Sequence, residues 1–394
     1  MRKLKLVVIP ALSLIFLSCT STFSRAMMRG DARVDDYKYF PERKIAAGRE
    51  VREIGCEPDV LYADRLAALL GTNDLQSFID QTKTQVLLVL KGDKLIYEAY
   101  GKDYSRESIV TSFSVAKSFV SAMIGELIEQ GKIKSVEQPV TDFIPELGER
   151  DERFSRIRLC DLLGMTSGIS YSERTFDDTK TYYAPDLRTL ATTKTKIAEP
   201  PARHFLYNNY NPLLLGIVIE RASGTTVSSY LQENIWNPMG AEFDASWSLD
   251  SDSSGFEKME SGLNARAIDF ARFGCMYRDG GKVNGRQIIS ESWIHASISD
   301  HHSDQPDFYK DDFGCKLKNA EQGGYYSYFW YVLKREPPMH NDFFAAGNKS
   351  QIIYVSPESE LVIVRFGEKD GIDFWKWISA FYNLAIQTIN TGRN

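Results

Sequence analysis

Two strand-rich segments near opposite ends of the chain restrict its possible folds most strongly. The first, "QVLLVLKGDKLIYEAYG", has two β-rich runs around Gly92 and Asp93, and the second, "QIIYVSPESELVIVRFG", has two around Pro357. Each pattern is typical of a β-hairpin. Because mainly helical segments lie between the hairpins, we expect one antiparallel sheet built from both chain ends, and therefore an α+β fold.

The sequence between the hairpins predicts a mostly helical middle region, with helices that cover the sheet. Residues 208–224 predict a loop entering a helix that ends at Gly224, and "NARAIDFARFGCMYRDGG" predicts another helix that ends at a glycine pair. After the second hairpin, "FWKWISAFYNLAIQTIN" predicts a final helix.

A serine lies three residues before a lysine in the stretch "TSFSVAKSFVSAMIGELIEQGKI", at Ser114 and Lys117. From Ala116 onward, apolar residues at helical spacing predict a buried helix that stops near Gly131. A chain of this length contains about one such serine-lysine pair by chance. The spacing alone therefore leaves two interpretations open, a nucleophile with its base or a hydroxyl near the start of a helix.

The catalytic interpretation is chemically sound in this setting. Residues i and i+3 share one face of a helix, so Lys117 can reach the hydroxyl of Ser114. Burial disfavours the charged form of lysine and lowers its pKa, which allows the amine to take the proton of a serine nucleophile. The N–H groups at the start of the helix can stabilise an oxyanion.

Composition excludes several other classes of protein. The chain has 394 residues, 43% of them hydrophobic and 25% charged, which suits a globular protein with a large core. A net charge of -6 argues against a nucleic-acid-binding protein. We find no G-x-S-x-G elbow, H-E-x-x-H motif, P-loop or Rossmann glycine pattern, and we expect no metal or cofactor.

The N-terminus predicts export. A basic start, "MRKLK", precedes the apolar run "LVVIPALSLIFLS", which ends at Cys19. The run is short for a transmembrane helix and is typical of a secretory signal. Because "IFLSC" resembles a bacterial lipoprotein signal, we expect residues 1–18 to be a signal peptide, Cys19 to be lipidated, and residues 19–50 to be a membrane tether. Residues 51–394 would then form the folded domain.

The other cysteines are Cys56, Cys160, Cys275 and Cys315. None forms a C-x-x-C pair or lies at metal-ligand spacing from a histidine. We expect them to be mostly small buried residues, and the sequence assigns no disulfide pairing.

Several motifs together resemble the serine β-lactamase-related and penicillin-binding-protein superfamily, in its class C-like branch. The helix with Ser114 and Lys117 resembles the S-x-x-K motif, and "IRLCDLLGMTSGI" resembles the Thr-Ser-Gly turn that follows it. "FLYNNYNPLLLGIVIERASG" matches the Tyr-x-Asn motif at Tyr207 and Asn209. The similarity extends from about residue 86 to residue 378, and the order and spacing of the motifs are specific. It implies the β-lactamase/transpeptidase-like fold.

The resemblance also implies roles for these residues in acyl transfer. Ser114 would attack a carbonyl while Lys117 receives its proton. Tyr207 would be the second acid-base group, with its anion favoured by a close ammonium. Asn209 would hold Lys117 and the substrate by hydrogen bonds. Relatives also use a tyrosine after the Ser-Gly turn, and here Tyr171, Tyr182 and Tyr183 are candidates.

The third motif departs from that of the β-lactamases. In place of Lys-Thr-Gly or His-x-Gly, the chain has Ala345, Ala346 and Gly347, followed by Asn348. The backbone N–H of Asn348 could complete an oxyanion hole with that of Ser114, because a backbone donor tolerates a change of side chain. The cation that usually meets a substrate carboxylate is missing.

This departure favours the esterase and amidase relatives, in particular enzymes similar to 6-aminohexanoate-dimer hydrolase. We expect an exported, lipid-anchored serine hydrolase that acts on a small ester or amide. The alternatives are a D-Ala-D-Ala peptidase-like enzyme that acts on cell-wall peptides, and an inactive lipoprotein that only binds a ligand. The sequence does not define the oligomeric state.

Overall fold

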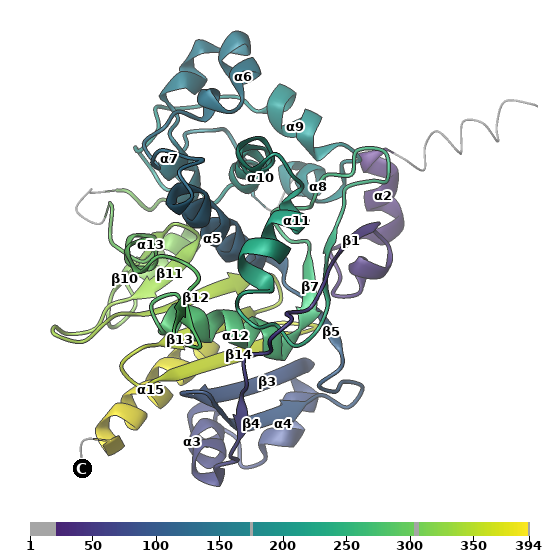
Figure 1. The fold of residues 1–394 in the computed structure, drawn as a ribbon. Coiled ribbons are helices and arrows are strands. Elements are labelled where there is room, and N and C mark those ends of the chain that lie inside the picture. Colours follow the sequence, from purple (N-terminus) through teal and green to yellow (C-terminus); the bar gives the residue numbers. More distant parts are fainter. Residues whose placement is uncertain (1–20, 174–175, 303–306, 393–394) are drawn as a thin grey trace, which may run out of the picture.

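A computed structural model of the chain describes residues 21–173, 176–302 and 307–392, and its centre is a large β-sheet (Figure 1). The eight strands lie in the order β10-β11-β12-β13-β14-β3-β4-β2, and all neighbours are antiparallel except β2 and β4. In that order the strands are Gly324–Ser327, Trp330–Leu333, Asp342–Gly347, Gln351–Ser356, Leu361–Gly367, Thr84–Lys91, Lys94–Tyr100 and Gly55–Cys56. Both predicted hairpins form, and β3 of the first pairs with β14 of the second. The α+β fold and the sheet built from both chain ends are confirmed.

Helices cover both faces of this sheet, as strand β13 illustrates. Its Ile353 and Val355 point toward Gly274 in α12 (Ala267–Arg278), where a Cβ would lie 2.9 and 3.6 Å from their methyl groups. Between them, Tyr354 points to the other face and meets Phe381 of the C-terminal helix α15 (Phe374–Gly392). Alternate residues of one strand therefore pack in two cores. Helices α3 (Val60–Leu70) and α4 (Leu75–Gln81) lie with α15 on its side of the sheet (Figure 1).

The middle of the chain is mostly helical, as expected, but it also contributes to a second sheet that the sequence did not reveal. The helices are α5 (Ala116–Glu129), α6 (Pro145–Arg150), α7 (Leu159–Leu163), α8 (Phe176–Tyr183), α9 (Leu187–Lys194), α10 (Tyr210–Ser223), α11 (Val227–Leu231), α13 (Glu291–Ser297) and α14 (Asp312–Lys318). The second sheet has the order β1-β6-β7-β5, formed by Glu42–Ile45, Ala245–Ser248, Leu263–Arg266 and Ile109–Thr111. A small hairpin joins β8 (Lys282–Val283) to β9 (Arg286–Gln287).

Much of the segment expected to be a tether instead belongs to the folded body. Helix α2 (Thr22–Arg29) packs against α8, and β1 (Glu42–Ile45) pairs with β6. Polar composition suggested a tether, but the hydrogen bonds of β1 and those of Arg25 in α2 to the carbonyls of Tyr183 and Asp250 attach this segment to the domain. The predicted signal peptide and Cys19 lie outside the described residues. Within those residues, no helix is long and apolar enough to cross a membrane.

The cysteines are less buried than expected. Only Cys275 is buried, whereas Cys160 and Cys315 are partly exposed and Cys56 is exposed. All four are free thiols. Cys56 lies on the two-residue edge strand β2, which explains its exposure.

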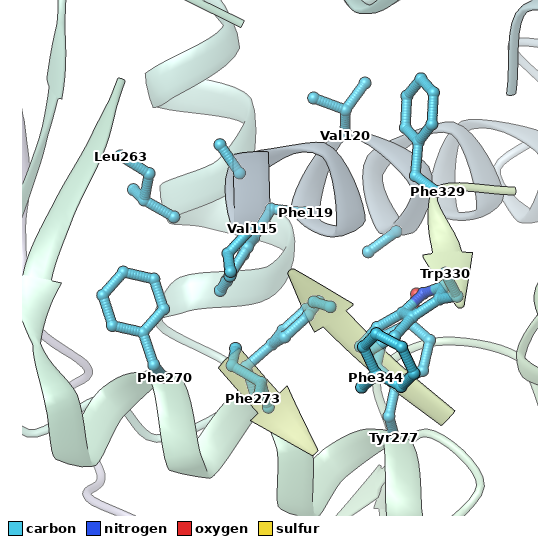
Figure 2. Packing of buried hydrophobic residues seen from close by; sticks show 14 of the residues in the cluster. Val115, Phe119, Val120, Leu263, Phe270, Phe273, Tyr277, Phe329, Trp330 and Phe344 are labelled. Atoms are coloured by element: carbon cyan, nitrogen blue, oxygen red, sulfur yellow. The ribbon is translucent and has the colours of Figure 1, made fainter. Parts of the chain in front are cut away.

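Helix α5 is buried almost all round and joins the sheet to the helical region. Figure 2 shows Phe119 of α5 against Phe273 of α12; the two rings are stacked with centroids 3.7 Å apart. Phe270 meets the same Phe119 edge-on, at 5.9 Å. A helix with an apolar surface on all sides is stable only inside a core. This packing fixes the position of the two candidate catalytic residues at its N-terminal end.

Candidate active site

The candidate nucleophile lies on a sharp turn that leads into α5. Residues Phe113–Val115 form one 3-10 turn, and Phe113 has φ 42°, a left-handed conformation that is uncommon outside glycine. The hydroxyl of Ser112 donates to the carbonyl of Phe113 at 3.0 Å and to that of Ser261 at 3.3 Å. The surrounding structure thus holds a strained backbone that presents Ser114 at the start of the helix.

Lys117 lies beside Ser114 and is fully buried. Its Nζ is 2.8 Å from Ser114 Oγ and donates to the carbonyl of Glu260 at 3.0 Å. Burial lowers the pKa of Lys117 to about 7, although the carboxylates of Glu260, Asp178 and Glu173 oppose this change. The burial predicted for Lys117 is confirmed. Near neutral pH, a large fraction of this amine is uncharged and can accept the serine proton.

Tyr207 completes a group of three side chains. Its ring centroid is 4.9 Å from Lys117 Nζ, and its hydroxyl contacts that of Ser114. Burial raises the pKa of Tyr207 far enough to outweigh the contact with Ser114. The expected tyrosine anion is therefore disfavoured, because desolvation outweighs the attraction of a lysine that is only partly charged near neutral pH. A neutral phenol next to a neutral amine can donate or relay a proton.

Asn209 lies near the group but does not hold Lys117. Its Nδ2 donates to the hydroxyl of Tyr171 at 2.9 Å and to Asp178 Oδ1 at 3.3 Å. Its Oδ1 is buried and has no hydrogen-bond partner. The hydrogen bond expected between Asn209 and Lys117 is absent from the described contacts, and Lys117 Nζ donates to the carbonyl of Glu260 instead. Asn209 thus leaves one buried acceptor unsatisfied, and a bound substrate could satisfy it.

Of the three candidate tyrosines, only Tyr171 forms a hydrogen bond with a candidate site residue, and that residue is Asn209. Its hydroxyl contacts Asp178 and Asn209. Tyr182 donates instead to Asp36, and Tyr183 donates to the carbonyl of Gly30. The last two fix the N-terminal segment to α8.

The Thr-Ser-Gly turn supports the loop that carries Tyr207 and Asn209. The N–H of Leu206 donates to the carbonyl of Met165 at 2.8 Å, and the Asn208 side chain donates to the carbonyl of Ile169 at 2.9 Å. Gly168 has φ 71°, and a Cβ there would lie 2.1 Å from a carbonyl oxygen. Only glycine fits this position, which explains the glycine in the Thr-Ser-Gly turn.

Strand β12 brings the altered third motif against the nucleophile. A Cβ on Gly347 would lie 2.6 Å from the carbonyl oxygen of Ser112 and 2.9 Å from the backbone nitrogen of Ser114. Strand β12 therefore lies so close to the candidate oxyanion site that no side chain fits at position 347. The role of the Asn348 N–H remains a prediction that this placement supports.

Comparison with known proteins assigns the chain. The model of the family described as Beta-lactamase matches residues 75–371, well over half of the sequence. The chain belongs to the beta-lactamase family. A relative, the 6-aminohexanoate-dimer hydrolase of Paenarthrobacter ureafaciens, is 25% identical over 332 residues, which cover 81% of this chain and 80% of the relative.

Solved structures of family members have the same fold. A Bacillus anthracis protein assigned provisionally as a 6-aminohexanoate-dimer hydrolase superposes with a TM-score of 0.70, at 21% identity, over 92% of this chain and 93% of its own. EstCE1, a hydrolase with promiscuous acyltransferase activity, superposes with a TM-score of 0.61 at 15% identity, over 84% of this chain and 100% of its own. A penicillin-binding protein from Bacillus halodurans superposes with a TM-score of 0.60 at 17% identity, over 79% of this chain and 100% of its own.

In this member of the beta-lactamase family, a buried arginine fixes the turn after the third motif. Gly347 pairs with Gln351, so residues 348–350 form the loop of the hairpin. Arg365 is fully buried, and its Nη1 donates to the carbonyls of Lys349 and Ser350 at 2.7 and 2.8 Å. Both of these loop residues have positive φ. The sequence did not predict this role of Arg365, because a β-strand pattern does not show which side chain will donate hydrogen bonds to the carbonyls of a distant loop.

Replacing Gly347 with alanine should lower kcat/KM for an ester substrate by about 10²-fold. The new methyl group would overlap backbone atoms of Ser112 and Ser114, so strand β12 must move away from the oxyanion site. Gly55→Ala is the matched control, because its nearest atoms would be 3.8 and 3.9 Å away. Wild-type kinetics in Gly347→Ala would contradict the placement of the oxyanion site at this strand.

Replacing Tyr207 with phenylalanine should lower kcat by about 10²- to 10³-fold, because the proton donor beside Ser114 is lost. Steady-state kinetics with a chromogenic ester would measure the change. Tyr210→Phe is the control, since Tyr210 packs edge-on against Tyr171 and lies three residues after Tyr207, at the start of α10. Equal activity of the two variants would exclude an acid-base role for Tyr207.

Proposed function

We propose that the protein is an exported, lipid-anchored serine hydrolase that cleaves a small ester or amide through an acyl-enzyme on Ser114. The observation that carries this proposal is the contact of Ser114 with a fully buried Lys117 at 2.8 Å. Membership of the beta-lactamase family supports the proposal, as do relatives that include 6-aminohexanoate-dimer hydrolase and EstCE1, a hydrolase with promiscuous acyltransferase activity.

The proposed reaction has two steps. Lys117 takes the proton of Ser114 as Oγ attacks the carbonyl, and the backbone N–H groups of Ser114 and Asn348 hold the developing oxyanion. Tyr207 relays a proton to the leaving alcohol or amine, which departs and leaves a serine ester. Water then attacks that ester, its proton passes back through Tyr207 and Lys117, and the acid product and free Ser114 are released.

The charges around the site support a neutral or cationic substrate rather than one with a carboxylate. Three carboxylates, those of Glu173, Asp178 and Glu260, act electrostatically on Lys117. The buried Lys258 lies 3.3 Å from Glu260, so its charge is already balanced. A cell-wall peptide that ends in a carboxylate would meet this acidic lining without the cation of the usual third motif.

A panel of reagents on the full chain tests the proposal. We expect turnover of a chromogenic ester, with kcat/KM about 10-fold or more higher for a neutral acyl group than for its carboxylate-bearing analogue. A serine-reactive phosphonate should label the peptide that contains Ser114. Stable labelling by a fluorescent penicillin with little ester turnover would favour the peptidase alternative. An absence of both labelling and turnover would favour the ligand-binding lipoprotein.

Export and anchoring rest on the N-terminal sequence, "MRKLK" followed by an apolar run that ends at Cys19. Mass spectrometry of the N-terminal peptide from membrane-extracted protein tests this part. We expect a peptide that begins at Cys19 and carries acyl groups. An unmodified Cys19 would contradict the lipid anchor and leave the hydrolase proposal unaffected.

A further inference from the structure

Helix α2 has its charged side against the protein. Arg25 Nη1 donates to the carbonyl of Asp250 at 2.5 Å and to that of Tyr183 at 3.5 Å. One turn later, Arg29 Nε donates to Asp36 Oδ1 at 3.2 Å, and the two side chains form an ion pair. Residues i and i+4 lie on one face of a helix, so both arginines hold the same face of α2 to the domain.

The opposite side of α2 is apolar and exposed. Phe23 is 68% exposed and Met27 is 71% exposed, whereas Met28, 56% exposed, lies on the flank of the helix nearer the arginines. Phe23 and Met27 are again i and i+4, about 200° around the helix from Arg25 and Arg29 respectively. This arrangement is the reverse of an ordinary surface helix, whose apolar side packs on the core. The exposed face thus consists of Phe23 and Met27, and two large apolar side chains side by side on one exposed helix face indicate a contact surface.

We propose that this apolar face of α2 lies in the interface of a lipid bilayer. The choice of a bilayer rests on the proposed lipidation of Cys19, four residues before Phe23. A chain extends at most about 3.6 Å per residue, so acyl chains on Cys19 would keep Phe23 within roughly 14 Å of the membrane. A helix that lies in the interface buries its apolar side chains about 5–10 Å deep, which is within that reach.

The docked face would fix how the active site is oriented to the membrane. Helix α2 lies at the edge of the molecule beside α8, which carries Asp178 of the candidate site (Figure 1). Tyr183 at the end of α8 donates to the carbonyl of Gly30, and its own carbonyl accepts from Arg25. Each of the two segments, α2 with Gly30 and the end of α8, therefore donates a hydrogen bond to the other. If α2 were held in the bilayer, α8 would be held at a constant height above the lipid.

Fluorescence quenching of the full chain in vesicles tests the proposal. Phe23→Trp places a reporter on the apolar face, and Leu61→Trp places one at an exposed apolar position of α3, at the far end of the molecule (Figure 1). Each protein is reconstituted into phosphatidylcholine vesicles with or without brominated acyl chains, and the emission of the unsubstituted protein, which has 6 tryptophans, is subtracted. Unchanged ester turnover shows that each variant is folded.

We expect brominated lipid to remove most of the emission added at position 23 and little of that added at position 61. Salt should not change this result, because apolar burial rather than charge supplies the contact. Emission at position 23 that survives bromination would overturn the proposal. Surviving emission that is blue-shifted and depends on protein concentration would assign the face to a second copy of the chain, which also overturns it.

The same samples distinguish this inference from the proposed anchor. Acylation of Cys19 is read from the mass of the N-terminal peptide, independently of fluorescence. Quenching at position 23 supports docking of α2 whether or not Cys19 is acylated. An acylated chain without quenching at position 23 would support the anchor and overturn the docking.

Discussion

Replacing Ser114 with alanine should lower kcat/KM for a chromogenic ester by at least about 10³-fold and abolish labelling by a serine-reactive phosphonate. The hydroxyl of Ser114 contacts Lys117 and Tyr207, and strand β12 passes close to the backbone nitrogen of the same residue. Because several groups act through this one oxygen, its loss should cost nearly as much as the loss of all of them. The fold should survive, since alanine fits the same turn and Lys117 Nζ keeps its hydrogen bond to the carbonyl of Glu260.

Ser118→Ala is the matched control for this variant. Ser118 lies one turn further along α5, and its hydroxyl donates to the carbonyl of Phe329 at 2.8 Å. Its loss should cost about 1 kcal/mol of stability and leave ester turnover nearly unchanged. If Ser114→Ala retained the wild-type rate while Ser118→Ala lost it, the assignment of the nucleophile would be wrong.

Replacing Lys117 with methionine should lower kcat by at least about 10³-fold and at the same time stabilise the fold. The burial that lowers the pKa of Lys117 to about 7 is an energetic cost of the native state. At pH 7 that cost is on the order of 4 kcal/mol, and an apolar side chain of similar length avoids it. Thermal unfolding at pH 7 should therefore show a melting temperature several degrees higher than that of the wild type. A destabilised Lys117→Met variant would contradict this account.

The pH dependence of the wild type follows from the same pKa. Catalysis needs the neutral amine, so kcat/KM should rise as the pH passes through about 7 and then level off. Lys117→Arg should be inactive across this range, because its guanidinium stays protonated. Between pH 7 and the unfolded value of 10.5, the unfolded chain binds more protons than the native one, so wild-type stability should rise with pH. That rise should be smaller in Lys117→Met, where the buried Lys258, whose pKa burial also lowers, still contributes.

The parts of the fold that the sequence predicts are those with local signals. The hairpin turn at Gly92, the β-rich runs around Pro357 and the helical spacing from Ala116 each depend on neighbouring residues, and all three are confirmed. The second sheet had no such signal, because strand β1 pairs with β6 about 200 residues later. Strands of four residues are too short to show a pattern of their own.

The candidate site divides in the same way. Ser114, Lys117 and Tyr207 come together as the motifs predicted, since each motif fixes residue types at a constant spacing. The neutral state of Tyr207 was missed because desolvation depends on everything packed around a side chain. The contact between Asn209 and Tyr171 was not predicted, because it joins two loops and the spacing of residues in the sequence does not show how close two loops lie in space.

Glu260 supplies two separate properties of the catalytic amine. Its main-chain oxygen fixes where the amine of Lys117 lies, and its carboxylate helps to set how readily that amine holds a proton. Mutation can change the carboxylate but cannot delete the carbonyl. Substitutions at this position can therefore retune the basicity of Lys117 during evolution while its location is preserved, and only a change in the course of the backbone would move it.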